Sequence, residues 1–361
     1  MVKRKKKKNK ILFILLLLVL IGGASYYLMT NGTSFESFAP FINKVKNTLK
    51  EKKVSIIDID SNTRPYAVMI NNVNAAWPYQ AGLCDAYIEY TLLVEGGLTR
   101  KMALFKDVSD DIKIMSIRSS RHYFIDYALE NDAIYTHWGW SPYAQSDIKT
   151  FKVNNINGLY YENVYFERDK EVRKKVSSEH TGFITTGNIK KASEKLGYRM
   201  TTDNKSLLKY SVDSIDASKY ENVVDADKVE IRYSGYYTSK YDYDVKTKKY
   251  TKMQNNTEMK DYNDTCELMY KNIITYQIPY ANISGDAKGR LNATTTGSGT
   301  GYYITEGKAI PITWEKKERS SKTIYKYANG DELVVNDGNT AIEIQPKNQS
   351  LKITKIEREE E

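Results

Sequence analysis

The chain has 361 residues and a formal net charge of +9, from 54 Lys and Arg against 45 Asp and Glu. Seven of those basic residues stand among the first ten positions, which hold no acid. The remaining chain therefore carries 47 basic and 45 acidic residues, a net charge of +2. Because a nearly neutral body binds a phosphate backbone poorly, no nucleic-acid partner is expected.

An uncharged, apolar stretch follows the basic tail of residues 1–10. Residues 11–29 are long enough as a helix to cross a hydrocarbon core, which needs about 20 apolar residues. Basic clusters stay on the cytoplasmic side, so the sequence predicts a single-pass signal anchor in the plasma membrane. Membrane lipid is then one partner, and the bulk of the chain is extracytoplasmic.

A cleaved signal peptide is the alternative for this segment. Its apolar core, residues 11–21, is short enough, and Gly22, Gly23 and Ala24 offer the small residues that signal peptidase prefers. No cysteine lies nearby, which argues against a lipid-modified terminus. Both alternatives export the rest of the chain.

The exported part is expected to be α+β, with a mixed α/β first domain and a mostly antiparallel β second domain. The expected segments are a juxtamembrane spacer, the first domain, a linker, the second domain and a charged tail: residues 30–62, 63–200, 201–227, 228–348 and 349–361.

Short runs rich in β-branched and aromatic residues predict the strands of the first domain. These runs are residues 65–71, 87–95, 100–108, 111–118 and 132–138. Helices are predicted over residues 121–131, 141–151 and 186–197. Ser119 and Ser120 are predicted to cap the first of these helices, and Gly197 is predicted to end the last.

The second domain is predicted to consist almost entirely of strands, as a sheet, sandwich or open barrel. Strand runs cover residues 229–237, 241–253, 273–280, 301–317 and 323–345. Three dipeptides predict hairpin turns: Glu306-Gly307, Asn329-Gly330 and Asp337-Gly338. The Gly-rich residues 294–301 lack the Lys and the helix of a phosphate loop, so a flexible loop is predicted there.

With these segments in order, the chain resembles the YerB-like family of exported bacterial proteins. In the first half the motifs are RPYAVMINN, EGGLTR, IRSSR, YTHWGWSP, NGLYY and His180-Thr181. In the second half they are YDYDVKTKKY, TGSGTGYYITEGKAIPITWEKK and TAIEIQP. The resemblance implies an exported two-domain protein of uncharacterised activity. Lipoproteins of this family anchor through a lipidated Cys, from which this chain departs.

An anion-binding site is predicted where EGGLTR and IRSSR come together. Arg100 follows a Gly-Gly turn, while Arg118 and Arg121 flank Ser119 and Ser120 at a predicted helix start. A helix N-terminus favours anions, and arginines add planar donors suited to phosphate or carboxylate. The anion could be a ligand from the cell envelope.

Internal salt bridges are the alternative to a bound ligand, with Glu95 or Asp126 as the supporting carboxylates. His137 lies at the end of a predicted strand and joins the candidate site, with Ser141 and His180 as further candidates. A nucleophilic Ser141 with His137 as base would lack the usual GxSxG turn.

No metal site and no cofactor are expected, because the histidines lack ligand spacing and no CxxC pattern occurs. Cys84 and Cys266 can pair in an exported protein, but so few cysteines argue against a fold that depends on a disulfide. The sequence leaves their pairing open.

Three functions remain open from the sequence. The first is an envelope-associated binding protein with an arginine-rich anion site, which is not an enzyme. The second is a membrane-surface enzyme acting on a lipid-linked phosphate or a wall polymer. The third is a structural scaffold of a membrane complex.

Overall fold

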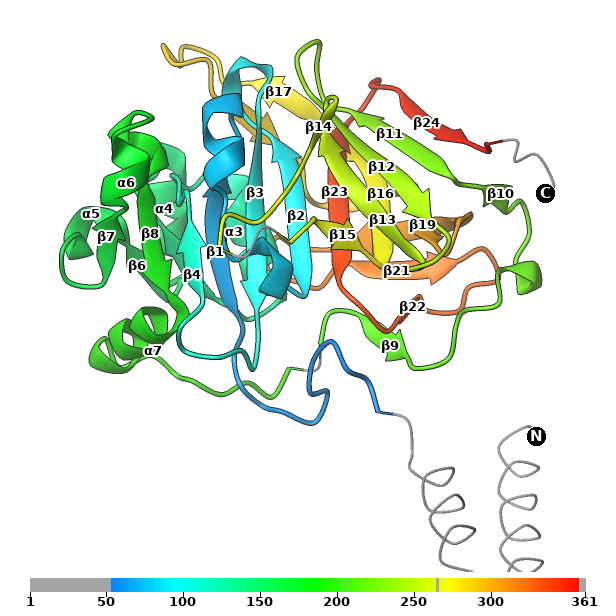
Figure 1. Ribbon diagram of the computed structural model, residues 1–361, viewed down its shortest axis with the longest axis horizontal. Coiled ribbons are helices and arrows are strands. Elements are labelled where there is room, and N and C mark those ends of the chain that lie inside the picture. The colour runs from blue at the N-terminus through cyan, green and yellow to red at the C-terminus, as the bar shows by residue number, and fades with distance from the viewer. Residues whose placement is uncertain (1–52, 205, 264–265, 357–361) are drawn as a thin grey trace, which may run out of the picture. The chain divides into compact units, whose positions relative to one another are not determined.

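The computed structural model describes residues 53–204, 206–263 and 266–356 (Figure 1). The predicted anchor and most of the predicted spacer lie outside these ranges. Within them, no helix combines the length and the apolar character that a membrane crossing requires.

The first half alternates strands with helices. Its strands are β1 (Tyr66–Asn71), β2 (Ile88–Leu93), β3 (Thr99–Phe105), β4 (Lys113–Met115), β5 (Ile134–His137), β6 (Asn155–Asn157), β7 (Phe166–Arg168) and β8 (Gly182–Thr185). Its α-helices are α3 (His122–Glu130), α4 (Pro142–Thr150), α5 (Gly158–Tyr161), α6 (Lys170–Arg173) and α7 (Thr186–Lys195). Short 3-10 helices are η2 (Asn74–Tyr79), η3 (Leu83–Asp85), η4 (Glu95–Gly97) and η5 (Ser178–His180).

The second half is built from strands, with one 3-10 helix, η6 (Ala217–Lys219). Its strands are β9 (Lys209–Ser211), β10 (Val224–Asp225), β11 (Lys228–Arg232), β12 (Thr238–Asp244), β13 (Lys249–Gln254), β14 (Thr257–Glu258), β15 (Met269–Tyr270), β16 (Asn272–Ile278), β17 (Tyr280–Asn282), β18 (Leu291–Ala293), β19 (Gly297–Thr305), β20 (Lys308–Lys316), β21 (Ile324–Tyr327), β22 (Val334–Asn336), β23 (Thr340–Pro346) and β24 (Leu351–Thr354). The predicted mixed first half and mainly antiparallel second half are thus confirmed.

One 11-stranded sheet runs through both halves, in the order β10-β20-β19-β16-β23-β2-β3-β1-β5-β6, with β21 beside β20. The joint is β23, which pairs in parallel with β16 on one side and with β2 on the other. Every residue of β23 is buried. A strand buried on both faces is suited to a central position among parallel neighbours.

The central position of β23 explains a wrong turn prediction. Asp337-Gly338 was expected to form a hairpin, but β22 before it pairs in parallel with β9 instead of with β23. The Asp337 carboxylate accepts hydrogen bonds from the backbone N–H groups of Ser55 and Ile56. The predicted linker, residues 201–227, contributes two strands to the fold: β9, which pairs with β22, and β10, which pairs with β20.

The hairpin predicted at Glu306-Gly307 is confirmed as the β19–β20 turn, and both residues have positive φ, 47° and 76°. The flexible loop predicted over residues 294–301 is wrong, because β19 begins at Gly297. A Cβ on Gly301 would lie 2.3 Å from the carbonyl oxygen of Thr275 on the neighbouring strand. Glycine is required there for close packing rather than for a loop.

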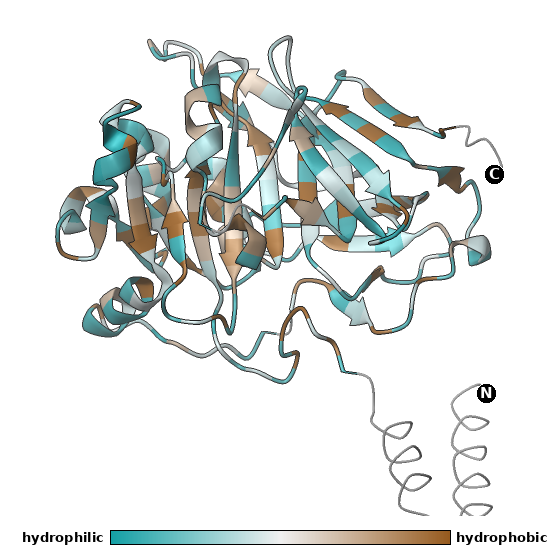
Figure 2. Cartoon of the chain, viewed as in Figure 1, coloured by the Kyte–Doolittle hydropathy of each residue, from teal (hydrophilic) through white to brown (hydrophobic). Residues whose placement is uncertain are grey.

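The main sheet is covered on both faces. Helices α3 and α4 pack in one core, with Tyr123, Phe124 and Ile148 among its buried residues. On the opposite face lies a six-stranded sheet with the path β14-β13-β12-β11-β24, and β15 beside β13 (Figure 1). Along β11 hydrophobic and hydrophilic residues alternate, as expected for a strand with one face towards the core (Figure 2).

Four fully buried charged residues lie between the two sheets: Glu89, Lys101, Lys252 and Glu343. The Lys252 ammonium is 2.5 Å from Glu89 Oε1 and 2.8 Å from Glu343 Oε1, and Lys101 is 3.3 Å from Glu89 Oε2. Burial would raise the pKa of Glu89, but the two lysines lower it to about 2. Three tyrosine hydroxyls also donate to these carboxylates: Tyr233, Tyr241 and Tyr270.

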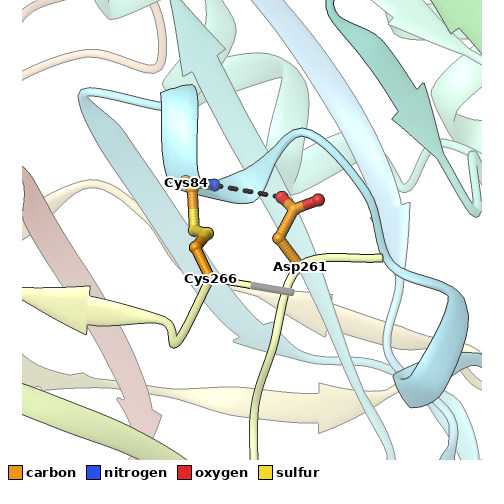
Figure 3. Close-up of side chains that lie close together, drawn as sticks. All are labelled: Cys84, Asp261 and Cys266. Atoms are coloured by element: carbon orange, nitrogen blue, oxygen red, sulfur yellow. Dashed lines mark hydrogen bonds between the residues drawn. A yellow bond between two sulfur atoms is a disulfide. The ribbon is translucent and has the colours of Figure 1, made fainter. Parts of the chain in front are cut away.

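A disulfide joins the two halves as well. Cys84 in η3 is bonded to Cys266, 182 positions later, and the Cys84 N–H donates to Asp261 Oδ2 at 3.2 Å (Figure 3). These three residues are also a group of potential metal ligands within the described part of the chain. Because the sulfur atoms are bonded to each other, neither is a thiolate ligand.

Candidate anion-binding site

Arg118 follows β4 and reaches a surface pocket of about 350 Å³. The backbone here is fixed, since the Arg118 N–H donates to the Met69 carbonyl of β1. A second arginine, Arg168, comes from the end of β7. The pocket is lined by Ile117, Arg118, Ser119, Trp138, Gly139, Trp140, Leu159, Arg168 and Glu179.

Both arginines in this pocket already have carboxylate partners. Arg118 Nη2 lies 2.7 Å from Glu179 Oε2, and Arg168 Nε lies 2.7 Å from Glu162 Oε1. The hydrogen bond from Arg118 lowers the pKa of Glu179, so this carboxylate is ionised at neutral pH. An anion entering the pocket would compete with Glu179 for Arg118.

Aromatic rings form the pocket's apolar wall. The Arg168 guanidinium lies over the Trp138 ring, 4.3 Å from its centroid. This cation–π contact stabilises the positive charge of Arg168. Trp140 makes an edge contact with Tyr160, with the ring centroids 5.7 Å apart. The pocket therefore offers guanidinium donors beside flat apolar surface.

Arg121 and Arg100 do not line this pocket. Arg121 Nε donates to Glu95 Oε2 at 2.8 Å, and Nη2 donates to the other carboxylate oxygen. Burial alone would raise the pKa of Glu95, but Arg121 lowers it to about 2. Arg121 therefore forms the internal salt bridge with Glu95 that was the alternative to a bound ligand.

Arg100 is a buried cation on β3. Its Nη1 donates to the Ser119 carbonyl at 2.5 Å, and its Nε has no hydrogen-bond partner among the described residues. Burial and the nearby charge of Arg121 lower the pKa of Arg100 to about 9. Arg100 supports the loop that carries Ser119 and does not face the pocket.

The predicted serine cap of helix α3 is wrong. The helix begins at His122 after Arg121, without a side-chain cap. The Ser119 hydroxyl donates to the Trp138 carbonyl, and the Ser120 hydroxyl accepts from Tyr135. A β-bridge between Ser120 and Trp140 holds the serines against this neighbouring segment, so they cannot turn towards the helix.

Asp126 binds neither Arg118 nor Arg121. Its carboxylate accepts from Arg319 Nε at 2.9 Å and from the Thr295 hydroxyl at 2.6 Å. Burial raises the pKa of Asp126, although Arg319 partly offsets that effect. This contact joins α3 to the second half of the chain.

The histidines occupy different environments. His137 is fully buried, with Nδ1 2.8 Å from the Gly139 carbonyl and Nε2 3.2 Å from Asn155 Oδ1. Burial lowers its pKa to about 4, so it is neutral at pH 7. His180 lies beside the pocket, 3.6 Å from Glu179. Ser141 accepts from the Ala144 N–H as the cap of α4.

Sequence reasoning missed Arg168 and Glu179. Both stand in the charged run from Glu162 to Glu179, where the sequence gives no signal that separates them from surface charges. Only the pairing of β7 with β8 brings this run against the segment that carries Arg118.

Comparisons with known proteins cover both halves. Residues 55–199 match a family model described as the N-terminal domain of a protein of unknown function (DUF3048), and residues 229–342 match the DUF3048 C-terminal domain. The chain is 27% identical over 319 residues to "Putative lipoprotein YerB" of Bacillus subtilis (strain 168). This alignment covers 87% of this chain and 92% of that protein. The crystal structure of the YerB protein from Bacillus subtilis is similar, with a TM-score of 0.71, 25% identity, and coverage of 84% of this chain and 97% of that one.

Proposed function

The chain belongs to the DUF3048 family, whose function is unknown, so we propose a function from the pocket of this chain itself. The protein is a membrane-attached extracytoplasmic protein that binds an anionic ligand through Arg118 and Arg168. The observation that carries the proposal is that these two guanidinium groups open on one pocket with tryptophan walls. Arginine donors match phosphate or carboxylate oxygens, and aromatic faces suit an apolar or planar neighbour.

Exposed apolar side chains beside the pocket favour an amphiphilic anion, such as a lipid-linked phosphate. Leu159, which lines the pocket, and Tyr160, whose ring contacts Trp140 of the pocket wall, are 59% and 65% exposed. Large apolar side chains grouped at a surface commonly mark a binding site. A phosphate on the arginines would leave its hydrocarbon part next to these residues.

The location is supported by several independent features. The relative named above carries the description "Putative lipoprotein", and Cys84 and Cys266 form a disulfide, a bond that persists in oxidising compartments. The basic tail and the apolar residues 11–29 suit a membrane anchor. N-terminal sequencing of the mature protein tests the anchor: a chain that begins at Ser25 would be exported without it.

Binding to inorganic phosphate, pyrophosphate and a polyprenyl phosphate tests the ligand. The full-length chain in lipid nanodiscs is titrated while tryptophan fluorescence is followed. Arg118→Ala and Arg168→Ala each lower the affinity about tenfold or more, since a charged hydrogen bond contributes about 1.5–3 kcal/mol. Glu179→Gln raises the affinity, because it removes the carboxylate that competes for Arg118.

The matched control is Arg232→Ala, an exposed arginine outside the pocket, which leaves every affinity unchanged. Equal affinities for the wild type, Arg118→Ala and Arg168→Ala would refute the proposal.

A second candidate function is an enzyme acting on the same phosphate, because Glu179 and His180 lie beside Arg118. Release of inorganic phosphate from a polyprenyl phosphate would distinguish the two functions. An enzyme loses turnover in Glu179→Gln, whereas a binding protein shows no turnover in either form.

A further inference from the structure

A second pocket lies where β16 and β19 separate, and its lining residues are distant in sequence from Arg118 and Arg168. Their pairing ends at Tyr276 and Gly301, whereas β19 continues to Gly297 paired only with β20. The resulting groove has a volume of about 610 Å³ and is bounded by Leu351 of β24. Ligand sites commonly measure about 300–1,000 Å³.

Side chains on one face of the sheet form the floor of this groove. Thr275, Tyr302 and Pro311 lie in register across β16, β19 and β20. In the next row Thr300 lies opposite Thr313. The groove also contains Ser298, Gln277, Gln345 and Lys347.

Hydroxyl groups dominate the floor and have no internal partners. Among the described residues, no side-chain hydrogen bond is formed by Thr275, Ser298, Thr300, Tyr302 or Thr313. Thr275 is the most informative, because it is 1% exposed and its Oγ1 is buried without a partner. Buried polar side chains normally have a hydrogen-bond partner, and the protein supplies none to this hydroxyl at the lining of the groove.

The amides at the end of the groove are held in place. Gln345 Nε2 donates to the carbonyls of Arg232 and Ser350, both at 2.7 Å. Gln277 Nε2 donates to Gln345 Oε1 at 3.0 Å and to the Gln349 carbonyl at 2.8 Å. These two hydrogen bonds hold the side-chain amide of Gln277 in one orientation and leave its Oε1 as an acceptor.

We propose that this groove binds a neutral oligosaccharide. Besides the buried Tyr276, its lining holds five hydroxyl side chains, two amides and one cation, Lys347, but no carboxylate. Such a set matches a polyhydroxylated chain, which both donates and accepts at many positions. The ring of Tyr302 beside Pro311 offers an apolar surface for the face of a sugar ring.

The groove and the arginine pocket share no lining residue, so the two proposals can fail separately. An extended peptide is the competing occupant, because β19 is open along one edge from Ser298 to Thr300. The many free hydroxyls favour the oligosaccharide, since an added strand would be held mainly by backbone hydrogen bonds.

The test is calorimetric titration of the full-length chain in lipid nanodiscs with the tetramer of N-acetylglucosamine and with cellotetraose. At least one of the two binds. Tyr302→Ala and Gln277→Ala each weaken that binding about fivefold or more, the effect of one lost hydrogen bond or ring contact. Thr275→Val also weakens it while the urea midpoint stays equal or rises, because the removed hydroxyl has no partner in the fold.

Two controls accompany these variants. Tyr236→Ala removes a tyrosine that is 77% exposed and lies outside the groove, and Arg118→Ala alters the other site; both bind the sugar as the wild type does. The proposal is overturned if neither sugar binds at millimolar concentration, or if all three groove variants bind unchanged. Binding of an alternating Val-Thr hexapeptide in a Tyr302-dependent way, without sugar binding, also overturns it.

Discussion

Replacing Lys252 by methionine tests the buried charges between the two sheets. Lys252 is the one residue of the four that contacts both carboxylates, Glu89 and Glu343. In Lys252→Met, Glu89 keeps Lys101 at 3.3 Å, while Glu343 keeps only tyrosine hydroxyls. The variant therefore holds a buried carboxylate without a cation.

The expected loss is about 3–5 kcal/mol, the usual result when one partner of a buried ion pair is removed. Against a typical total stability of about 5–15 kcal/mol, this is a large part of the free energy of unfolding. Adding Glu343→Gln removes the excess negative charge and leaves Glu89 with Lys101. The double variant should therefore be more stable than the sum of the two single losses predicts, by at least about 1 kcal/mol.

Urea unfolding followed by tryptophan fluorescence measures these losses, with the disulfide intact in every sample. Lys240→Met is the control: its ammonium is 3.1 Å from Glu230, but the side chains are 26% and 40% exposed. Pairs of that kind contribute about 0.2–1 kcal/mol. A loss below about 1 kcal/mol in Lys252→Met, or strict additivity with Glu343→Gln, would refute the reasoning.

Three further predictions concern stability. Arg121→Met lowers the free energy of unfolding by about 1.5–3 kcal/mol. Because the pKa of Glu95 is lowered from 4.5 to about 2, the stabilisation from this ion pair is complete above pH 4.5 and disappears as the pH falls towards 2. Urea unfolding at several pH values measures this change. Reducing the bond between Cys84 and Cys266, 182 residues apart, costs about 2–5 kcal/mol in urea unfolding with and without reductant. Gly301→Ala loses about 1–3 kcal/mol of thermal stability, because the added carbon lies 2.3 Å from a carbonyl oxygen.

Each of these predictions has its own control. The fall in stability between pH 4.5 and pH 2 should be smaller in Arg121→Met than in the wild type, and an equal fall contradicts the assignment to Glu95. Equal urea midpoints for oxidised and reduced protein contradict the disulfide prediction. Gly235→Ala, where an added carbon meets nothing within 4 Å, should change stability by less than about 0.5 kcal/mol.

Local chemistry explains the elements that could be predicted. Ser141 with Pro142 starts α4, Gly197 at φ 67° follows α7, and Glu306-Gly307 turns β19 into β20. In each case a few adjacent residues determine the backbone, so no distant contact is needed. The charge balance and the apolar residues 11–29 are also properties of the sequence alone.

The candidate pocket could be predicted only in part from the sequence, because its lining residues meet through the pairing of distant segments. Arg100, Arg118 and Arg121 are near one another in sequence, yet only Arg118 lines the pocket. Its pocket partner Arg168 is 50 positions away in a run of charges that looks like solvated surface.

By itself the sequence determined the start of α4, the end of α7, the turn at Glu306-Gly307 and the nearly neutral charge of the chain after its basic tail. The tertiary structure alone decided that β23 (Thr340–Pro346) joins the two halves in one sheet, that Cys84 bonds Cys266, and that Lys252 lies between two carboxylates. The physical reason is that turns and helix ends depend on neighbouring residues, whereas strand partners and buried ion pairs depend on segments brought together only by folding.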